Sequence, residues 1–278
     1  SLVNSQYNQA GVSHELAVLR ASEIKNINYK LSLVIPEQLS EKIEGKVEIS
    51  FELLNPKHDL FLDFQNEPHL IKSVLINKKH KEYRFEHEHI IIPLKYLKKK
   101  NTITIHFIAG ESSLNRNKAY LFSLFVPDKA SVAFPCFDQP ELKATFELDL
   151  HVPAKWIAAS NAKIIKEEKT RNGNFYQFNK THKISTYLFA FVAGEFFKVN
   201  SKIGKRSFNL YHREFDSTKV AQNIDSIFSY HASALKWMED YTGIPYPFEK
   251  LDFVSVPSFQ FSGMEHVGII YYRDSRIF

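Results

Sequence analysis

Residues 145–152 read Thr145-Phe146-Glu147-Leu148-Asp149-Leu150-His151-Val152, with an apolar side chain at every second position. Because successive side chains of a β-strand point to opposite faces, this alternation predicts a strand with one face in a core and the other in water. The stretches from Val47 to Leu53 and from Thr102 to Phe107 alternate in the same way. We therefore expect a sheet with one buried face at the centre of the fold.

Outward from these stretches, short strand candidates fill most of the sequence up to about residue 200. They are residues 28–35, 60–64, 70–76, 83–85, 89–92, 157–159, 163–166, 175–178 and 187–192. Turn-forming pairs such as Asn55-Pro56, Asn172-Gly173 and Ala193-Gly194 separate them. No long helix is expected before about residue 217. The pattern is therefore typical of a mainly β domain with an antiparallel sheet, and it does not fit alternating strands and helices.

The pattern changes after about residue 200. Apolar residues then recur every three or four positions, at Val220, Ile224, Ile227, Phe228, Ala234, Leu235, Met238 and Tyr241. This spacing predicts a helix that Asp216 or Ser217 caps and that Gly243 ends. Strands are expected over residues 251–256 and 264–272. One helix and two strands bury little core, so we expect one domain over residues 1–200 and the incomplete beginning of a second over residues 201–278.

Composition narrows the class of protein. The hydrophobic share of 44% and the aromatic share of 14% exceed those of a disordered chain, and no apolar run is long enough to span a membrane. The formal charge is +5, but the basic residues are scattered among almost as many acidic ones. The only dense basic run is Lys98-Lys99-Lys100, which is typical of a solvated turn. We expect a soluble protein that does not bind nucleic acid.

Several kinds of catalytic site are missing from the sequence. Cys136 is the only cysteine, which excludes an internal disulfide and a thiolate metal cluster. Among the twelve histidines, no two stand four positions apart as a His-Glu-x-x-His zinc motif requires. The chain also has no Gly-x-Ser-x-Gly elbow and no glycine-rich phosphate loop. Cys136 itself, between Pro135 and Phe137, is expected to be a buried apolar residue.

Two segments carry the most specific chemistry. The first runs Ala133-Phe134-Pro135-Cys136-Phe137-Asp138-Gln139-Pro140, and the second runs Ser262-Gly263-Met264-Glu265-His266. In the second segment, the missing Cβ of Gly263 lets another backbone approach, and the Glu265 carboxylate can accept hydrogen bonds from an ammonium group. A glycine and a glutamate near a strand start are common by themselves, so the pairing with the first segment decides the interpretation.

In this order, the two segments resemble those of zinc aminopeptidases of the aminopeptidase N type, a gluzincin family. Members carry a Phe-Pro-Cys-Phe-Asp-Glu-Pro-like segment and, farther along the chain, Gly-x-Met-Glu-Asn. The resemblance implies a saddle-like antiparallel β-sandwich domain followed by the start of an α/β thermolysin-like catalytic domain. It also implies a hydrolase that removes residues from peptides with a free amino terminus, with zinc as its cofactor.

The resemblance assigns substrate-binding roles to four residues. Glu265 would hold the α-ammonium group of the peptide, Gly263 and Met264 would pair their backbone with it, and His266 stands where the family has Asn. Ser262 replaces the usual first Gly of the motif. Upstream, Leu124 and Val126 occupy positions where many members have Gln and Glu in the pocket for the first side chain.

In this family the zinc ligands follow the Met-Glu strand, and the sequence ends at Phe278 before any such motif. We therefore expect a truncated chain with no metal site or catalytic residue of its own and no activity, whereas the parent protein would be the enzyme. That reading predicts an exposed apolar face on the strand from Met264. Two alternatives stay open, a non-catalytic relative and a free-standing β-sandwich that binds proteins or carbohydrates. Side-chain specificity, oligomeric state and compartment also stay open, the last between a periplasmic or secreted protein with its leader removed and a cytoplasmic one.

Overall fold

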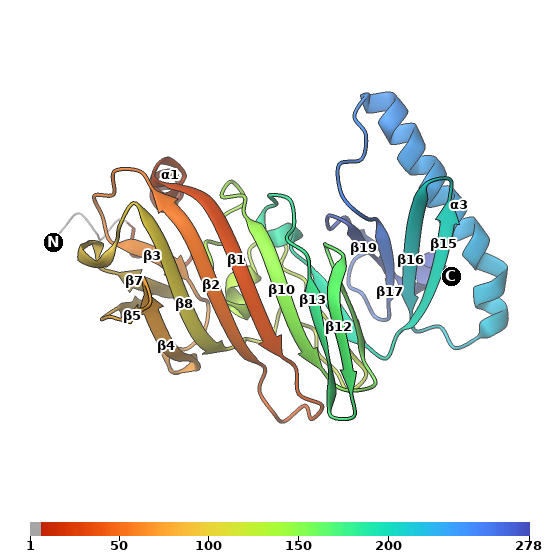
Figure 1. Cartoon of the computed structure of the whole chain (residues 1–278), viewed down its shortest axis with the longest axis horizontal. Helices are drawn as coiled ribbons and strands as arrows, with labels where there is room; N and C mark the ends of the chain where they lie inside the picture. The colour runs from red at the N-terminus through yellow and green to blue at the C-terminus, as the bar shows by residue number, and fades with distance from the viewer. Residues whose placement is uncertain (1–6) are drawn as a thin grey trace.

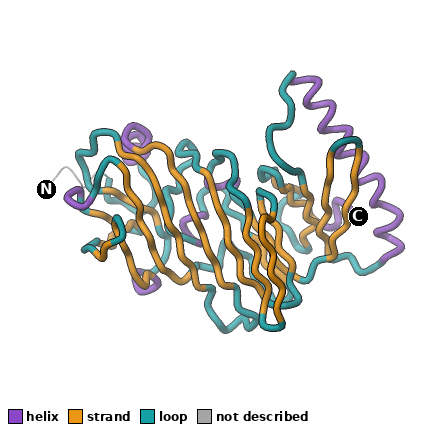
Figure 2. Tube along the Cα trace, viewed as in Figure 1, coloured by secondary structure: helices purple, strands orange, loops and turns teal. Residues whose placement is uncertain are grey.

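The computed structural model describes residues 7–278. The chain forms a large β part that extends from the N-terminal side of the molecule and a smaller part that holds the C-terminal end (Figure 1). Helices are few, and strands and loops make up most of the trace (Figure 2). The prediction of a mainly β protein is therefore confirmed.

The largest sheet has eight strands in the order β12-β13-β10-β1-β2-β8-β4-β5. Their bounds are β1 Ile24–Val34, β2 Glu44–Leu53, β4 Ile71–Ile76, β5 Lys79–His80, β8 Lys100–Ile108, β10 Thr145–Val152, β12 Ile164–Thr170 and β13 Gly173–Phe178. One pairing departs from the antiparallel prediction, because β1 and β10 run parallel. Between them the chain first forms β2, β4, β5 and β8 of the same sheet and then passes outside it before β10, since parallel neighbours need a crossover connection. The sheet is therefore mixed.

Two three-stranded sheets complete the β part. One has the order β3-β7-β6, with β3 Leu60–Asp63, β6 Arg84–Glu86 and β7 His89–Ile92. The other has the order β11-β14-β9, with β9 Tyr120–Phe122, β11 Ile157–Ser160 and β14 Phe191–Gly194. Every residue of β3, β7 and β14 is buried, and one continuous apolar core joins side chains from the large sheet and from both small sheets. This core makes the β part a sandwich.

Short helices occur where the sequence predicted strands or loops. The helix α1 spans His14–Glu23 and begins where the Ser13 side chain accepts a hydrogen bond from the Leu16 amide. The other short helices are α2 Ala130–Ala133 and the 3₁₀ turns η2 Pro68–Leu70, η3 Leu94–Tyr96 and η4 Thr186–Leu188. The strand predicted over residues 187–192 is wrong in its first half, since the chain there forms η4 before β14 begins at Phe191.

The second part is a five-stranded sheet in the order β15-β16-β17-β19-β18, with a long helix beside it (Figure 1). Its elements are β15 Phe197–Ile203, β16 Arg206–His212, α3 Ser217–Thr242, β17 Asp252–Val256, β18 Gly263–Met264, β19 Ile269–Arg273 and α4 Asp274–Ile277. The predicted helix is confirmed, with Asp216 as its cap and Gly243 at its end in the left-handed region, with φ of 67°. The strand predicted over residues 264–272 is in fact two strands, β18 and β19.

The helix α3 buries only a narrow stripe. Ile227 and Phe228 pack against Phe253 of the sheet, whereas Trp237 and Tyr241 on the other side are 60% and 76% exposed. Met264 is only 7% exposed, so the expectation of an exposed apolar face on its strand is wrong. The strand turns that side chain into the core, whereas large apolar side chains are exposed on the helix.

A second apolar core joins the two parts of the molecule. It contains Phe122 and Val192 from the sandwich together with Tyr211, Val254 and Met264 from the five-stranded sheet. The domain boundary expected near residue 200 falls inside β15 and stays a prediction. Within residues 7–278, no helix is long and apolar enough to cross a membrane.

Candidate functional site

The predicted substrate-binding segment forms an edge of the five-stranded sheet. Gly263 and Met264 of β18 pair with Tyr272 and Tyr271 of β19 on one side. On the other side, no strand of the described chain continues the sheet. Edge strands present unpaired backbone N–H and C=O groups, and an extended peptide can add to such an edge as a further strand.

Side chains alternate along this segment. Gly263 and Glu265 are exposed, whereas Met264 and His266 are buried. The Glu265 carboxylate has no hydrogen-bond or ion-pair partner among residues 7–278. The segment therefore presents one unneutralised negative charge, the Glu265 carboxylate, at the free edge of the strand. The neighbouring exposed residue, Gly263, has no side chain that could block this edge. This arrangement can accept an ammonium group from a peptide that lies along the edge.

Gly263 also has a close neighbour on the paired side. A Cβ atom at this position would lie 3.3 Å from the backbone oxygen of Tyr271 and 3.5 Å from Cδ1 of Tyr272. Any larger residue would press on β19. The glycine therefore keeps β18 close to its neighbour while leaving the free edge unobstructed.

The turn after Glu265 is anchored to the sandwich by Asn161. Its Nδ2 atom donates to the backbone oxygens of Val267 at 2.7 Å and Leu188 at 2.9 Å, and its Oδ1 atom accepts from the Ala190 amide at 2.7 Å. Gly268 has φ of 73°, and a Cβ there would lie 2.3 Å from the Asn161 backbone oxygen. This turn therefore needs glycine both for its backbone angle and for the close approach.

The loop before β18 is held by Arg273. Its Nε and Nη2 atoms donate to the backbone oxygens of Phe259 and Gln260, each at 2.8 Å, and its amide donates to the Ser262 oxygen at 3.1 Å. Both ends of the segment that carries Glu265 are thus fixed by hydrogen bonds. A fixed carboxylate loses less conformational entropy when it binds a ligand than a mobile one.

His266 lies beneath the strand and not at its open edge. The residue is 1% exposed, its ring meets the Tyr271 ring edge-on at 4.6 Å, and neither ring nitrogen has a partner among the described residues. Burial lowers the pKa of His266 to about 3, so the ring is neutral near pH 7. A substrate-binding role for His266 stays a prediction. Its buried position does not favour direct contact between its side chain and a peptide.

Leu124 and Val126 lie in the same apolar cluster as Met264. Leu124 is buried there with Phe122 and Phe259, and Val126 packs against the cluster from its partly exposed position. Residues from the sandwich and from the second sheet therefore meet beside β18. Leu124 and Val126 therefore make the surface near the candidate site apolar. A Gln and Glu pair at the same positions would offer hydrogen bonds there.

The segment from Phe134 to Pro140 has a structural role inside the sandwich. The Asp138 carboxylate accepts hydrogen bonds from the Ser131 amide at 2.9 Å and the Thr186 hydroxyl at 2.8 Å. The Phe137 amide donates to the Tyr29 hydroxyl at 2.9 Å. Cys136 is buried as predicted, and burial raises the pKa of its thiol well above the usual value. These contacts bind the segment to the core and do not expose a reactive group.

A buried ion pair that the sequence did not predict completes this network. Arg20 of α1 and the Asp63 carboxylate are 2.5 Å apart, and Nδ1 of His89 lies 2.9 Å from the same carboxylate. Burial raises the pKa of Asp63, but the Arg20 charge and the hydrogen bonds from His89 and Arg20 outweigh it and lower this pKa to about 2. Asp63 Oδ2 also accepts from the Asp138 amide at 2.8 Å, which links this pair to the Phe134 segment.

Within residues 7–278, no group of three His, Cys, Asp or Glu side chains is placed to hold a metal ion. A zinc site needs at least three such ligands around one point. The described side chains therefore do not fit zinc.

Comparisons with known proteins agree with the fold. The model of the peptidase M1 N-terminal domain matches residues 25–188, and the model of the peptidase family M1 domain matches residues 227–278. Three similar proteins illustrate the range of relatives. They are endoplasmic reticulum aminopeptidase 1 of Mus musculus, 34% identical over 154 residues; aminopeptidase M1 of Arabidopsis thaliana, 32% over 155; and aminopeptidase N of Streptomyces lividans, 31% over 165.

These alignments cover 55%, 55% and 58% of this chain, but only 16%, 17% and 19% of the respective relatives. The residues that the two family models match include most of the sandwich, the segment from Phe134 to Pro140 and the edge strand β18. The chain belongs to the zinc-dependent M1 aminopeptidase family, of which it carries the N-terminal domain and the start of the catalytic domain.

Proposed function

We propose that this protein recognises the free amino end of a peptide at the open edge of β18, as part of an enzyme that removes residues from peptide amino termini. The observation that supports this proposal most directly is the Glu265 carboxylate, which is exposed and unpaired next to that edge. Membership of the M1 family supplies the class of reaction and of substrate.

In this proposal, the peptide lies along β18 and pairs its backbone with Gly263 and Met264. Its first residue then reaches Glu265, whose carboxylate accepts hydrogen bonds from the α-ammonium group. A charge-assisted hydrogen bond of this kind contributes roughly 1.5 to 3 kcal/mol. Recognition of the amine sets which peptide bond lies at the reacting position, so it makes the enzyme an exopeptidase.

The family depends on zinc, and the described side chains contribute substrate recognition and not metal ligands. That the 278 residues alone do not hydrolyse peptides stays a prediction, as do the preferred first side chain and the compartment. The apolar residues Leu124 and Val126 favour peptides that make no polar contact on that side of the site.

The variant Glu265→Gln in the full-length protein tests the proposal. It removes one negative charge and keeps the shape of the side chain, so kcat/KM for a free-amine peptide should fall by about 10- to 100-fold. The matched control is Glu37→Gln, which alters an exposed glutamate in the loop between β1 and β2 and should leave kcat/KM unchanged. Zinc content should be the same in all three proteins. A Glu265→Gln enzyme with the native rate would remove Glu265 from recognition and favour a role of this edge in protein interaction.

A further inference from the structure

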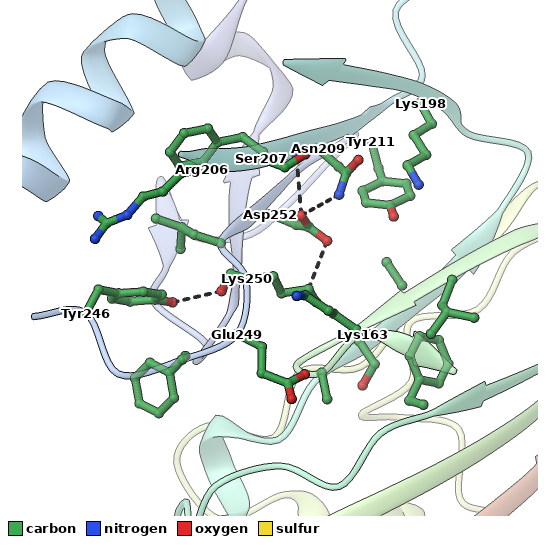
Figure 3. Close-up of a pocket in the computed structure, with 18 of the residues that line it drawn as sticks. Lys163, Lys198, Arg206, Ser207, Asn209, Tyr211, Tyr246, Glu249, Lys250 and Asp252 are labelled. Carbon is green, nitrogen blue, oxygen red and sulfur yellow. Dashed lines mark hydrogen bonds and ion pairs between the residues drawn. The ribbon is translucent and has the colours of Figure 1, made fainter. Parts of the chain in front are cut away.

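A cavity separate from the edge of β18 lies where the sandwich meets the five-stranded sheet. Its volume is about 530 Å³, and its walls come from the start of β12 on one side and from β15, β16 and β17 on the other (Figure 3). None of residues 263–266 lines it. Pockets of about 300 to 1,000 Å³ typically hold small molecules, so this cavity is large enough for one.

Basic side chains outnumber acidic ones around this cavity. Lys163, Lys198 and Lys205 line it, and within residues 7–278 none of the three lies within ion-pair distance of a carboxylate. The two other basic residues in the wall are already paired, Lys250 with Asp252 at 2.9 Å and Arg206 with Glu239 at 2.6 Å. The cavity therefore keeps an excess of positive charge that the protein does not neutralise.

The acidic residues of the wall are also occupied. Besides its ion pair with Lys250, Asp252 accepts from Nδ2 of Asn209 at 2.8 Å. Glu249 accepts from Nδ2 of Asn179 at 2.9 Å. The hydrogen bond from a neutral amide leaves the Glu249 charge in place, so the three unpaired lysines share the wall with one unpaired carboxylate, and the wall keeps a net positive charge.

Tyr211 places an unused hydrogen-bond donor in the cavity. The residue is 4% exposed, and its hydroxyl group has no partner among the described residues. The Lys198 ammonium lies 5.6 Å from the centre of the Tyr211 ring, and the two side chains lie next to each other at the cavity (Figure 3). Burial raises the pKa of Tyr211, so the hydroxyl keeps its proton and can donate it. The hydroxyl oxygen itself is not fully enclosed, so water reaches it in the free protein, and an anion that replaced this water could accept its hydrogen bond.

Lys250 also lines the cavity, and its ammonium is held by Asp252 and by the Gly268 backbone oxygen, each at 2.9 Å. Its side chain is 8% exposed, and burial together with the nearby Lys198 charge lowers its pKa despite the ion pair with Asp252. An anion between these lysines would reduce their mutual repulsion.

We propose that this cavity binds a small molecule through an oxyanion, a phosphate or carboxylate group, held by Lys163, Lys198 and the Tyr211 hydroxyl. Lys163 belongs to the sandwich, and Lys198 and Tyr211 belong to the second sheet. The anion therefore contacts both parts of the molecule at once. The proposal rests on this cavity alone and does not depend on the role of Glu265.

Calorimetric titrations of the purified protein with inorganic phosphate and with succinate, at one ionic strength set with potassium chloride, test this site. We expect saturable binding of one equivalent of at least one of the two anions. Lys198→Met and Lys163→Met should each weaken that binding by about tenfold or more, and Tyr211→Phe should weaken it about fivefold. Lys202→Met is the matched control, since Lys202 lies on the same strand as Lys198 but does not line the cavity.

The outcomes separate the two sources of the oxyanion. Tighter binding of phosphate assigns the site to phosphate-bearing molecules, and tighter binding of succinate assigns it to dicarboxylates. The proposal is overturned if neither anion binds saturably, or if Lys202→Met weakens binding as much as Lys198→Met. Tyr211→Phe keeps the ring, so without ligand it should melt at the same temperature as the native protein. The proposal is also overturned if this variant binds the anion as tightly as the native protein.

Discussion

Glu265 and His266 are neighbours in the chain but have opposite surroundings. Glu265 is exposed and unpaired, whereas His266 is buried without a partner for either ring nitrogen. Successive side chains of a strand point to opposite faces, which explains both surroundings. His266 shares the inner face with Met264, and Glu265 between them points outward. The sequence could predict that Glu265 points outward. It could not predict that a polar ring is buried, since nothing nearby in the chain pairs with it.

Replacing His266 with Phe tests the cost of burying this ring. Its pKa is about 3 in the folded protein against 6.5 for an ordinary histidine, so below pH 6.5 the unfolded chain binds a proton that the folded chain does not. Stability from this residue therefore falls as the pH falls, by up to about 1.4 kcal/mol per pH unit between about pH 6 and pH 4. His266→Phe should lose this dependence.

Urea unfolding at about pH 7 and pH 5 measures the difference. The matched control is His106→Phe on β8, which changes an exposed histidine and should keep the native dependence. If His266→Phe loses as much stability on acidification as the native protein does, then His266 is not buried in the neutral form.

The buried pair of Arg20 and Asp63 shows another limit of the sequence at this scale. The two residues stand 43 positions apart, and no local pattern connects them. One signal was present, because Asp63 interrupts the apolar run from Leu60 to Phe64. A charge inside a run that is otherwise fully buried requires a buried partner, and a search for that partner could have identified Arg20.

Single elements follow the sequence where their periodicity is strong. The strand β10 matches its prediction at both ends, and α3 has the predicted cap and C-terminal glycine. The strands β15 and β16 were not predicted, because lysine, serine and asparagine interrupt the alternation of apolar and polar residues along them. The single strand predicted over residues 264–272 is two strands, and Gly268 was the signal, since a glycine inside a strand pattern often marks a break.

Substituting Gly268 tests how this break positions Glu265. Gly268→Ala places a Cβ in the left-handed region and 2.3 Å from the Asn161 backbone oxygen. Gly204→Ala is the matched control, because it has φ of 60° but no atom within 4 Å of the added Cβ. The control should lose about 1 kcal/mol of unfolding free energy from its backbone angle alone. Gly268→Ala should lose at least about 2 kcal/mol more, because a backbone contact must shift. Equal losses in a denaturant titration would mean that Gly268 does not lie against the Asn161 backbone.

At the scale of the whole molecule, long-range pairing decides what the sequence cannot. The parallel pairing of β1 with β10 joins strands more than a hundred residues apart. The shared core that brings Leu124 beside Met264 likewise depends on how the two parts meet. The family resemblance predicted the candidate strand and its neighbours, but the cavity around Tyr211 forms only when both parts are in place.

The shared core also gives the candidate site its setting. Asn161 of the sandwich fixes the turn after Glu265, so the edge of β18 has a fixed orientation relative to both parts. A fixed open edge with one unpaired carboxylate is suited to a peptide that arrives with its amino group first. We therefore expect Glu265 to distinguish a peptide with a free amino terminus from one whose amino terminus is blocked.

The most direct test is the ratio of two dissociation constants, for a short peptide with a free amino terminus and for its N-acetylated copy. The native protein should bind the free peptide at least about tenfold more tightly, because acetylation removes the ammonium charge and Glu265 is left unpaired. In Glu265→Gln the ratio should fall to about one. Equal affinity of the native protein for the two peptides, or an unchanged ratio in Glu265→Gln, would contradict the claim.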